Sequence, residues 1–409
     1  MNKSKAHTEI KIARNIESYL LKLCDEIPNR HTGSAGNRQA SDFFAETMAS
    51  FGFTIEQDDF DCMDWEYGNV KLQAGNESYE AFVSPYSMPF SGAAELICVS
   101  LLDELQKADF NDKLLLLHGD IAKEQMMPKN FPFYNPDEHQ QIISLLEEKK
   151  PAAIICATGK NPELAGAWYP FPMFEDGDFN IPSVYMKDID GSNLLRHRGS
   201  EVSLSFESRR ISAKGTNVIA RKNEQAKNKI VFCAHIDAKK GTPGALDNAA
   251  GISTLLALGG LLKDSNPKYC IEITAFNGED YFAASGQIQY LSKYADTFEK
   301  IKLVVNIDGA GYFDGNTAFS LYECPKSISN TVEQVLKDYH GIKKGGQWYQ
   351  GDHMVFVQNN VPALAFTTSN FLPVWTEIAH TEKDVTDMVE PRKLAEAACV
   401  MKEIALNLK

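Results

Sequence analysis

The chain has 409 residues, of which 44% are hydrophobic and 23% charged, and a formal net charge of -14 at pH 7. The length exceeds what one hydrophobic core usually supports, so we expect two domains or one domain with a large insertion. The acidic balance argues against a nucleic-acid-binding protein, and no stretch approaches the roughly 20 apolar residues of a membrane-spanning helix.

The N-terminal part of the chain predicts two helices and a strand. Residues 8–27 have apolar residues at helical spacing, and Pro28 is expected to end that helix. Residues 30–37, RHTGSAGN, have the composition of a turn, residues 41–50 are predicted to be helical, and residues 53–57 a strand. Polar residues interrupt every apolar stretch here, so we expect no signal peptide.

The eight cysteines are scattered along the chain and form no CxxC pair. Several fall inside apolar stretches that have the pattern of strands. This favours buried, reduced thiols over disulfides or a cysteine zinc site. Together with the N-terminal sequence, it predicts a cytoplasmic protein.

Residues 66–207 differ in character from the segments on either side. Short apolar strands separated by long polar loops are expected there, at residues 114–117, 152–156 and 183–186. We therefore expect a β-rich domain at 66–207, inserted into a second domain formed by residues 1–65 and 208–409.

From residue 217 onward, short apolar strands alternate with amphipathic helices. The predicted strands are residues 217–221, 230–235, 270–276, 302–308, 316–321 and 363–367. The predicted helices are residues 248–262, 281–295, 326–339 and 391–407. The alternation indicates an α/β fold with a mostly parallel mixed sheet flanked by helices, in which ligands bind at the C-terminal ends of the strands.

His235 and Asp237 come at the end of the apolar strand 230–235. An imidazole there can ligate a metal ion, and an acid close to it can orient the ring and increase its basicity. The HxD pattern is short, so a histidine that caps a strand end explains it about equally well.

Asp247 lies in the glycine- and alanine-rich segment TPGALDNAAG, directly before the predicted helix 248–262. It could be the N-cap of that helix. The small neighbours would also let one carboxylate approach two metal ions. Both roles can hold at once.

Glu279 and Asp280 follow the apolar strand 270–276. Adjacent carboxylates raise each other's pKa unless a cation is present. The alternative is a pair of acids at the N-terminus of helix 281–295.

Asp308 closes an apolar strand, where an acid is unusual unless it is paired, hydrogen-bonded or bound to a metal. His380, in IAHTEKD, would by itself be read as a surface histidine. Two imidazoles and three carboxylates suit a pair of zinc-like ions that share one carboxylate, with an adjacent acid as general base. The candidate ligands are His235, Asp247, Asp280, Asp308 and His380.

Taken together, these segments resemble the co-catalytic di-zinc aminopeptidases related to bacterial leucyl aminopeptidases and glutamate carboxypeptidase. The resemblance runs from about residue 217 to 390, through NVIARK, the HxD strand, GALDNAAG, the Glu–Asp pair, NIDG, GDHMVF, VPAL and HTEKD. The segment RHTGSAGNRQASDFFAETMASFGF resembles the start of that family, and residues 66–207 resemble its protease-associated insertion.

The resemblance implies a zinc exopeptidase fold with two zinc ions per chain. Asp247 would bridge the two ions. His235 and Asp308 would complete one site, and Asp280 and His380 the other.

The implied catalytic residues stand next to the ligands. The resemblance assigns Glu279 as the general base and Asp237 as the catalytic partner of His235. Asp384 would help to hold the loop that carries His380.

The chain departs from the family pattern at three places. Asp280 stands where many relatives carry a glutamate, which has a longer reach. Ala379 stands where some relatives have a tyrosine that stabilises the tetrahedral oxyanion, so the oxyanion donor is unidentified. Gly351–Asp352–His353 stands where relatives often have Ser-Asp, and His353 either faces the substrate or is a structural loop residue.

The sequence therefore predicts a zinc metallopeptidase, an aminopeptidase that hydrolyses short peptides with a di-zinc-activated water and Glu279 as general base. One alternative is a carboxypeptidase or dipeptidase on the same scaffold, which arginine or lysine in the pocket would favour. Others are a glutaminyl-cyclase-like acyltransferase, which needs one zinc, and a non-catalytic receptor-like relative, which would have lost ligands or the base. The expected partner is a peptide substrate, with no nucleic acid and no membrane, and the oligomeric state is left open.

Overall fold

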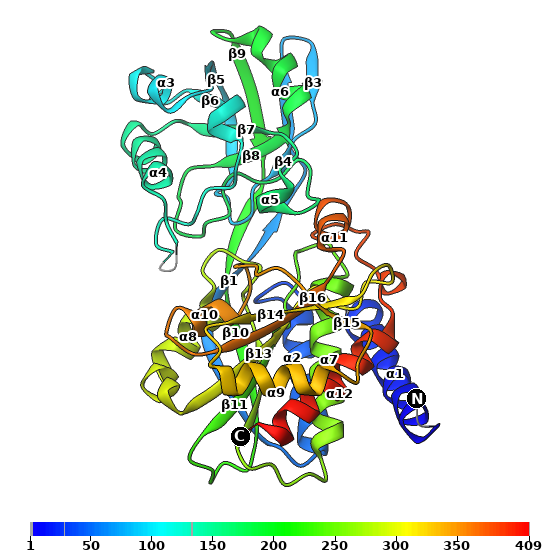
Figure 1. Ribbon diagram of the computed structural model, residues 1–409. Helices are drawn as coiled ribbons and strands as arrows, with labels where there is room; N and C mark the ends of the chain where they lie inside the picture. The colour runs from blue at the N-terminus through cyan, green and yellow to red at the C-terminus, as the bar shows by residue number, and fades with distance from the viewer. Residues whose placement is uncertain (1–2, 28, 132–133, 409) are drawn as a thin grey trace. The chain divides into compact units, whose positions relative to one another are not determined.

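The computed structural model describes residues 3–27, 29–131 and 134–408, so Pro28, the expected end of the first helix, lies outside the described residues. The chain divides into two compact units (Figure 1). Unit 1 takes the chain up to Asp61, Lys214–Asp280 and the segment from Ala284 onward, and unit 2 takes Cys62–Ala213 and Tyr281–Ala283.

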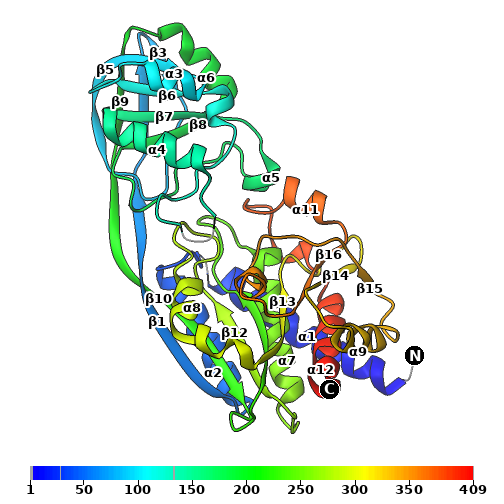
Figure 2. The ribbon, with the colours of Figure 1, turned by 60° about the vertical axis from the view of Figure 1, so that its left-hand side comes forward.

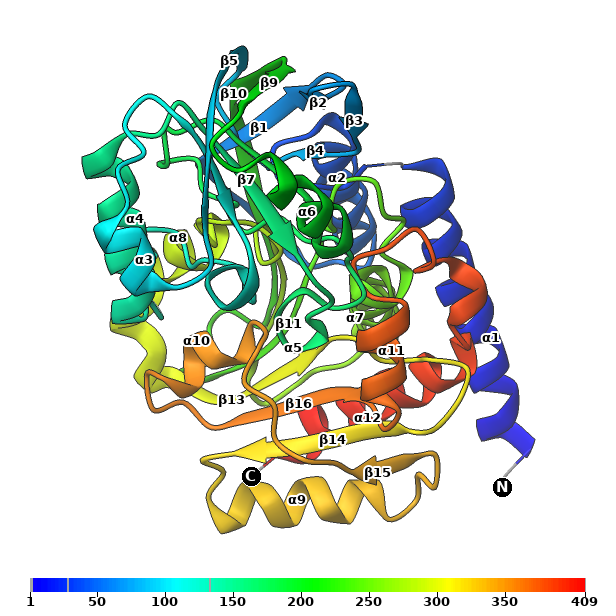
Figure 3. The ribbon, with the colours of Figure 1, turned by 90° about the horizontal axis from the view of Figure 1, so that it is seen from above.

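Unit 1 is built on an eight-stranded mixed sheet, and Figure 3 shows β13, β16, β14 and β15 following one another in it. In spatial order the strands are β1 (Thr54–Tyr67), β10 (Ser208–Lys222), β12 (Cys270–Phe276), β11 (Lys229–His235), β13 (Ile301–Ile307), β16 (Ala363–Thr368), β14 (Thr317–Tyr322) and β15 (Ile342–Lys344). Strands β12, β11, β13 and β16 pair in parallel, whereas β10 and β14 run antiparallel to β12 and β16. The central strands are buried along nearly their whole length, which explains their continuous apolar sequences. The predicted α/β fold is confirmed.

The helices of unit 1 are α1 (Lys3–Leu21), α2 (Ala35–Ser50), α7 (Ala250–Leu262), α8 (Ser285–Tyr294), α9 (Lys326–Leu336), α10 (His353–Val357), α11 (Phe371–Glu377) and α12 (Pro391–Asn407). Helices α1, α2 and α12 all pack against α7, and Figure 2 shows α1, α7 and α12 close together. By length and composition Ala245–Leu262 could cross a membrane, but 83% of this span is buried inside the protein. A helix that is apolar on all sides is expected at the centre of a core, which is where α7 lies.

Several elements begin or end away from their predicted positions. The first helix is α-helical to Leu21 and continues as a π-helical turn, Lys22–Glu26. Helix α2 begins inside the predicted turn because the Ser34 side chain caps it by accepting a hydrogen bond from the Asn37 amide (3.0 Å). The strand predicted at 53–57 extends to Tyr67. The sequence did not predict β15, α10 and α11, which have only 3, 5 and 7 residues and so show no clear period.

Unit 2 contains a second eight-stranded sheet. Its strands, in spatial order, are β3 (Glu77–Tyr79), β2 (Lys71–Ala74), β9 (Glu201–Phe206), β5 (Phe90–Val99), β6 (Leu114–Leu117), β7 (Ala153–Thr158), β8 (Ser183–Lys187) and β4 (Phe82–Val83). Its helices are α3 (Leu102–Lys107), α4 (Asp137–Lys149), α5 (Pro162–Ala165) and α6 (Asp188–Leu194).

The leucines of β6 explain how the helices of unit 2 are arranged. Successive strand residues face opposite sides of a sheet, and Leu115 and Leu117 accordingly pack with residues of α3 and α4. Leu114 and Leu116 pack instead with Leu194 of α6. Figure 3 shows α3 and α4 on one side of β7 and α6 on the other. The prediction of a β-rich domain left these helices out, and its identification as a protease-associated domain stays a prediction.

All eight cysteines lie in the described part of the chain and are free thiols; five are buried and three are half-buried. The expected burial is therefore found for five of the eight. The cytoplasmic location that was inferred partly from them stays a prediction.

Candidate metal centre

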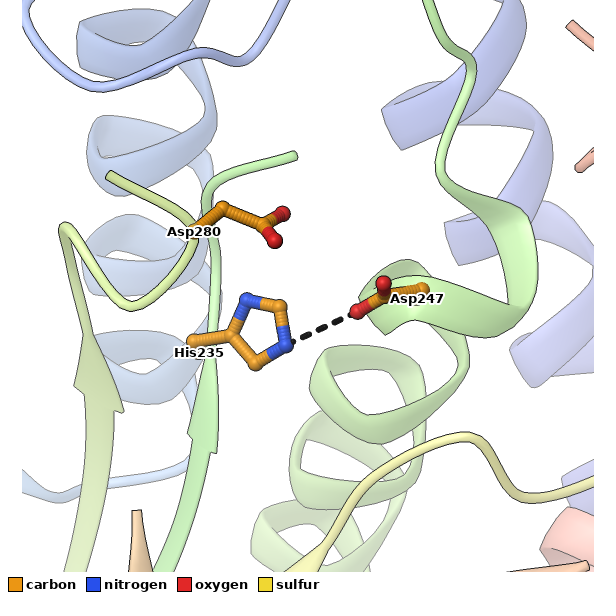
Figure 4. A group of neighbouring side chains, drawn as sticks. All are labelled: His235, Asp247 and Asp280. Atoms are coloured by element: carbon orange, nitrogen blue, oxygen red, sulfur yellow. Dashed lines mark ion pairs between the residues drawn. The ribbon is translucent and has the colours of Figure 1, made fainter. Parts of the chain in front are cut away.

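The five predicted ligands come from five separate segments of unit 1. His235 is the last residue of β11, Asp247 lies in the turn before α7, and Asp280 lies in the loop after β12 (Figure 4). Asp308 directly follows β13, and His380 comes three residues after α11. Since β12, β11 and β13 are parallel neighbours, their C-terminal ends meet at one edge of the sheet. The five side chains are brought together at this edge.

Asp247 faces one histidine with each of its two carboxylate oxygens. Its Oδ1 lies 3.0 Å from His235 Nε2, and its Oδ2 lies 3.1 Å from His380 Nε2. His235 Nε2 is also 3.5 Å from Asp308 Oδ1, and His380 Nε2 is 3.2 Å from Asp280 Oδ1. The cluster therefore separates into two sets of donors that have Asp247 in common.

The donor sets have the spacing and the chemistry of metal sites. His235 Nε2 and Asp280 Oδ2 are both buried without a hydrogen-bond partner, and donor atoms of His235, Asp247 and Asp280 lie within 4.8 Å of one another. Donor atoms at zinc–ligand distance in a tetrahedral site are about 3.4 Å apart. The histidine–carboxylate distances of 3.0 to 3.5 Å fit that spacing. The residues present thus fit a pair of zinc ions.

The pKa values of the two histidines indicate that metal ions would displace protons from the cluster. Burial by itself would lower the pKa of both histidines, but the surrounding carboxylates outweigh it. Asp247 and Asp280 raise the pKa of His380 to about 10. Asp308 and Glu279 raise the pKa of His235 well above its ordinary value. The surrounding acids thus favour the protonated form of both imidazoles when no metal ion is bound, and metal binding would release those protons because only neutral imidazole is a ligand.

Asp237 organises the loop that carries Glu279 and Asp280. Its fully buried carboxylate accepts hydrogen bonds from the backbone amides of Gly278 (2.9 Å), Glu279 (3.3 Å) and Asp280 (3.1 Å). Its distance to His235 Nδ1 is 3.7 Å, too long for a hydrogen bond. Asp237 thus lies beside His235, as the sequence predicted, but its direct partners are the amides of the next ligand loop.

Glu279 and Asp280 lie in this loop and not at a helix N-terminus, since α8 starts only at Ser285. The alternative that they are helix-terminal acids is therefore wrong. The Asp280 side chain is 3% exposed, whereas that of Glu279 is 20% exposed, with Oε2 4.0 Å from His235 Nε2. Asp280 is thus enclosed among the candidate ligands, while Glu279 is partly exposed.

Burial raises the pKa of the Glu279 carboxyl well above its ordinary value, and the negative charges of Asp280, Asp308 and Asp352 raise it further. Cations bound beside it would lower this pKa again. A carboxylate with a raised pKa beside candidate metal ligands suits a group that accepts a proton and gives it up again.

Asp384 holds the turn that contains Asp247. Its two carboxylate oxygens accept hydrogen bonds from the amides of Leu246 (2.7 Å) and Asp247 (3.1 Å), and its carbonyl accepts one from Ala245 (3.1 Å). Asp384 belongs to the His380 loop, which it was expected to hold. These hydrogen bonds link that loop to the turn of Asp247.

The start of α7 shows that Asp247 is not the N-cap. The side chain that caps this helix is Asn248, whose Oδ1 accepts a hydrogen bond from the Gly251 amide (2.9 Å). Gly251 has to be glycine, because a Cβ there would lie 2.6 Å from the Ile307 carbonyl oxygen. The Asp247 carboxylate is therefore left to face the two histidines.

Trp375 was not among the predicted site residues. It projects from α11 and lies edge-on to the His380 ring, with the ring centroids 5.0 Å apart, and Phe371 stacks on it at 5.7 Å. The only signal in the sequence was a tryptophan five residues before His380. The two aromatic side chains give the site an apolar wall next to one ligand.

His353 is a structural residue. It is fully buried between Trp348 and Tyr322, with ring centroids 4.5 and 4.7 Å away. Both ring nitrogens have partners: Nδ1 lies 3.2 Å from Asn306 Nδ2, and Nε2 lies 3.1 Å from the Trp348 carbonyl oxygen. These contacts favour the structural interpretation of His353 over the substrate-facing one.

The burial of His353 predicts a pH-dependent stability. Burial lowers its pKa to about 4 from an ordinary value of 6.5, so between these values the unfolded chain binds the extra proton and the folded protein does not. The free energy of unfolding should therefore fall by about 3 kcal/mol as the pH is lowered from 7 to 4. Urea unfolding of the metal-free protein across this range measures the slope. In His353→Gln the loss of stability between pH 7 and pH 4 should be smaller by this amount. An unchanged loss would contradict a buried neutral histidine.

Comparisons with known proteins agree with this fold. Residues 217–405 match the family model described as Peptidase family M28. The aminopeptidase YwaD of Bacillus subtilis is 22% identical over 241 residues. The match covers 55% of this chain and 51% of that protein, so the chain spans about half the length of this relative. The solved aminopeptidase from Aneurinibacillus sp. strain AM-1 has a TM-score of 0.72 at 20% identity, covering 97% of this chain and 96% of that one.

The glutaminyl cyclase of Fimbriiglobus ruber has a TM-score of 0.52 at 11% identity, covering 97% of this chain and 95% of that one. One fold thus carries more than one named activity. The activity of this chain has to be argued from its site.

Proposed function

Since residues 217–405 belong to peptidase family M28, we propose that the chain is a zinc-dependent aminopeptidase that removes N-terminal residues from short peptides. The main support for the proposal is that Asp247 faces one histidine with each of its two oxygens, so that the cluster forms two donor sets. His235, Asp308 and Asp247 Oδ1 would hold one ion, and His380, Asp280 and Asp247 Oδ2 would hold the other. Two such ions would supply Lewis acidity toward a peptide carbonyl and lower the pKa of a water molecule.

Glu279 is proposed as the general base and acid. It is the most exposed of the clustered acids, so a water molecule can reach it beside the ligands. Glu279 would take a proton from the attacking water as the new C–O bond forms. It would then deliver that proton to the nitrogen of the leaving amine as the C–N bond breaks.

The charge of the site supports an aminopeptidase over a carboxypeptidase. Four carboxylates line the cluster and would balance the charge of two zinc ions, so the loaded site would have no excess positive charge to attract a substrate carboxylate, and the net charge of -14 on the whole chain favours an ammonium group. Lys239 lies near the site, but its ammonium group donates a hydrogen bond to the backbone carbonyl of Asp280. It thus supports the ligand loop, which weakens the case for a carboxylate-binding pocket.

The remaining alternatives need fewer functional groups than this site has. A glutaminyl-cyclase-like acyltransferase would use one zinc ion, whereas the cluster offers two donor sets. A non-catalytic relative would lack ligands or the base, whereas all five candidate ligands and Glu279 are present in this chain. The complete set supports peptide hydrolysis.

The polarity of the exopeptidase is tested with blocked peptides. Acetylating the N-terminus of a good substrate should remove most of the turnover, because a site poor in water then lacks its ionic partner. Amidating the C-terminus of the same peptide is the matched control and should have little effect. Tolerance of N-terminal acetylation combined with refusal of C-terminal amides would overturn the aminopeptidase assignment in favour of a carboxypeptidase.

A further inference from the structure

Residues 30–37, named here the turn 30–37 although the last three belong to α2, lie outside the segment that matches the peptidase family. They nevertheless contact the loops that carry the candidate metal ligands. Three of their side chains make these contacts: Arg30, Thr32 and Asn37. All three are buried, with exposures of 1%, 3% and 0%. Buried polar groups are costly unless they are hydrogen-bonded, so where their bonds go tells what the turn holds in place.

The Arg30 guanidinium donates hydrogen bonds to backbone carbonyls in two places, directly after His235 and in the turn that contains Asp247. Its Nε donates to Ile236 (3.2 Å), the residue between His235 and Asp237. Nη1 donates to Pro243 (2.8 Å), and Nη2 donates to Gly244 (2.9 Å), three residues before Asp247. The planar guanidinium thereby fixes the end of β11 relative to the turn of Asp247.

Thr32 lies between two loops, with its hydroxyl directed to the loop after β11 and its methyl group near the loop after β12. Its hydroxyl donates to Asp237 Oδ2 (3.1 Å), the carboxylate that accepts the amides of residues 278–280. Its methyl carbon lies beside Gly278, 3.7 Å from where a Cβ would stand on that glycine. The hydroxyl thus completes the hydrogen bonding of Asp237.

Asn37 is paired with Asn277 at the end of β12. Each amide group donates to the other, with N–O distances of 2.8 and 2.9 Å. Asn37 also donates to the carbonyl oxygen of Arg30 (3.0 Å), which ties the two ends of the turn together. The loop of Glu279 and Asp280 is therefore fixed at its start by Asn37 and further along by Thr32 through Asp237.

We propose that the turn 30–37 is a positioning element of the metal centre, in which Arg30 sets the turn of Asp247 and Thr32 and Asn37 set the loop of Asp280. This proposal depends on the proposed function in one respect, because it assumes that the clustered donor residues bind zinc. Outer partners that orient ligand groups typically contribute 10- to 100-fold to metal affinity. Thr32 acts on a ligand through Asp237 and its amide bonds, so its contribution falls at the lower end of that range.

The two branches of the Thr32 side chain allow the hydrogen bond to be separated from packing. Thr32→Val keeps the methyl group near Gly278 and removes the hydroxyl, whereas Thr32→Ser keeps the hydroxyl and removes the methyl. A matched control is Thr158→Val in unit 2, where a buried threonine hydroxyl also makes two hydrogen bonds, with the Phe171 carbonyl (2.7 Å) and amide (3.1 Å). All variants are first compared by circular dichroism to establish that they are folded.

Zinc affinity is measured by competition with a chelator, and the absorption spectrum of the cobalt-loaded protein reports the geometry of the ligands. Thr32→Val should bind zinc roughly tenfold more weakly and shift the cobalt bands, while Thr32→Ser and Thr158→Val should match the wild type in both. A folded Thr32→Val with wild-type affinity and spectrum would overturn the positioning role and leave the proposed function standing. A wild-type protein that takes up no zinc would instead overturn the proposed function and this assignment together.

Discussion

Glu279→Gln should fold and bind two zinc ions as the wild type does, while kcat falls by about 10²–10⁴-fold. The amide keeps the size of the carboxylate, but it replaces one acceptor oxygen by an NH2 donor and cannot take a proton from water. Glu279 is the partly exposed member of the acid pair, 4.0 Å from His235, so its loss should leave both donor sets complete. Steady-state kinetics together with elemental analysis of the metal-loaded variant measures both effects.

Asp280→Asn is the matched control, because it neutralises the neighbouring acid. Asp280 Oδ1 lies 3.2 Å from His380 Nε2, inside one donor set. The control should therefore bind one zinc ion more weakly and lose activity for that reason. If Glu279→Gln lost metal and Asp280→Asn kept it, the roles of the two acids would be exchanged. If Glu279→Gln stayed within a few-fold of wild-type activity, another group would be the base.

Asp247→Ala should lower the occupancy of both zinc sites, because Asp247 is the residue that the two donor sets share. Removing it takes one oxygen from beside His235 and one from beside His380. It also leaves the two protonated histidines with fewer acids around them, so the metal-free variant should be less stable as well. Zinc stoichiometry after dialysis against a fixed concentration of free zinc measures the loss.

The control for this prediction is Asp308→Ala, which removes a donor from the His235 side only. It should weaken one ion and leave the other in place. Equal loss of both ions in the two variants would mean that the sites are filled cooperatively. Loss of a single ion in Asp247→Ala would contradict the bridging role.

The sequence predicted those parts of the fold that have a strong local pattern. The buried strands around His235 and Asp308 could be recognised because parallel strands covered on both faces are continuously apolar. Since each ends in an acid or an imidazole, the predicted ligands could be located as well. Their roles as ligands stay predictions, which the variants above test.

What the sequence did not predict has physical reasons. The Glu279 loop was taken for the start of a helix because acids favour helix N-termini, but Asp237 binds its amides and delays the helix to Ser285. For Arg30 and Thr32 the sequence predicts a turn and a resemblance to the start of the family, but no contact with the candidate ligands. Their partners lie more than 200 positions away, with separations of 206 and 205 residues, and no local period encodes such contacts.

The distance along the chain between Thr32 and Asp237 also bears on how the protein is made. A ribosome that adds 5–20 residues per second needs about 10–40 s to synthesise the 205 residues between them. Asp384, which binds the amides of the Asp247 turn, emerges a further 138 residues after Leu246. During that interval the nascent chain gains Asp247, Asp280 and Asp308 one after another, while the side chain that holds the Asp247 turn is still missing. All of unit 2 except Tyr281–Ala283 precedes the first of the candidate ligands, His235, along the chain. The metal centre is therefore among the last parts of the molecule that can form.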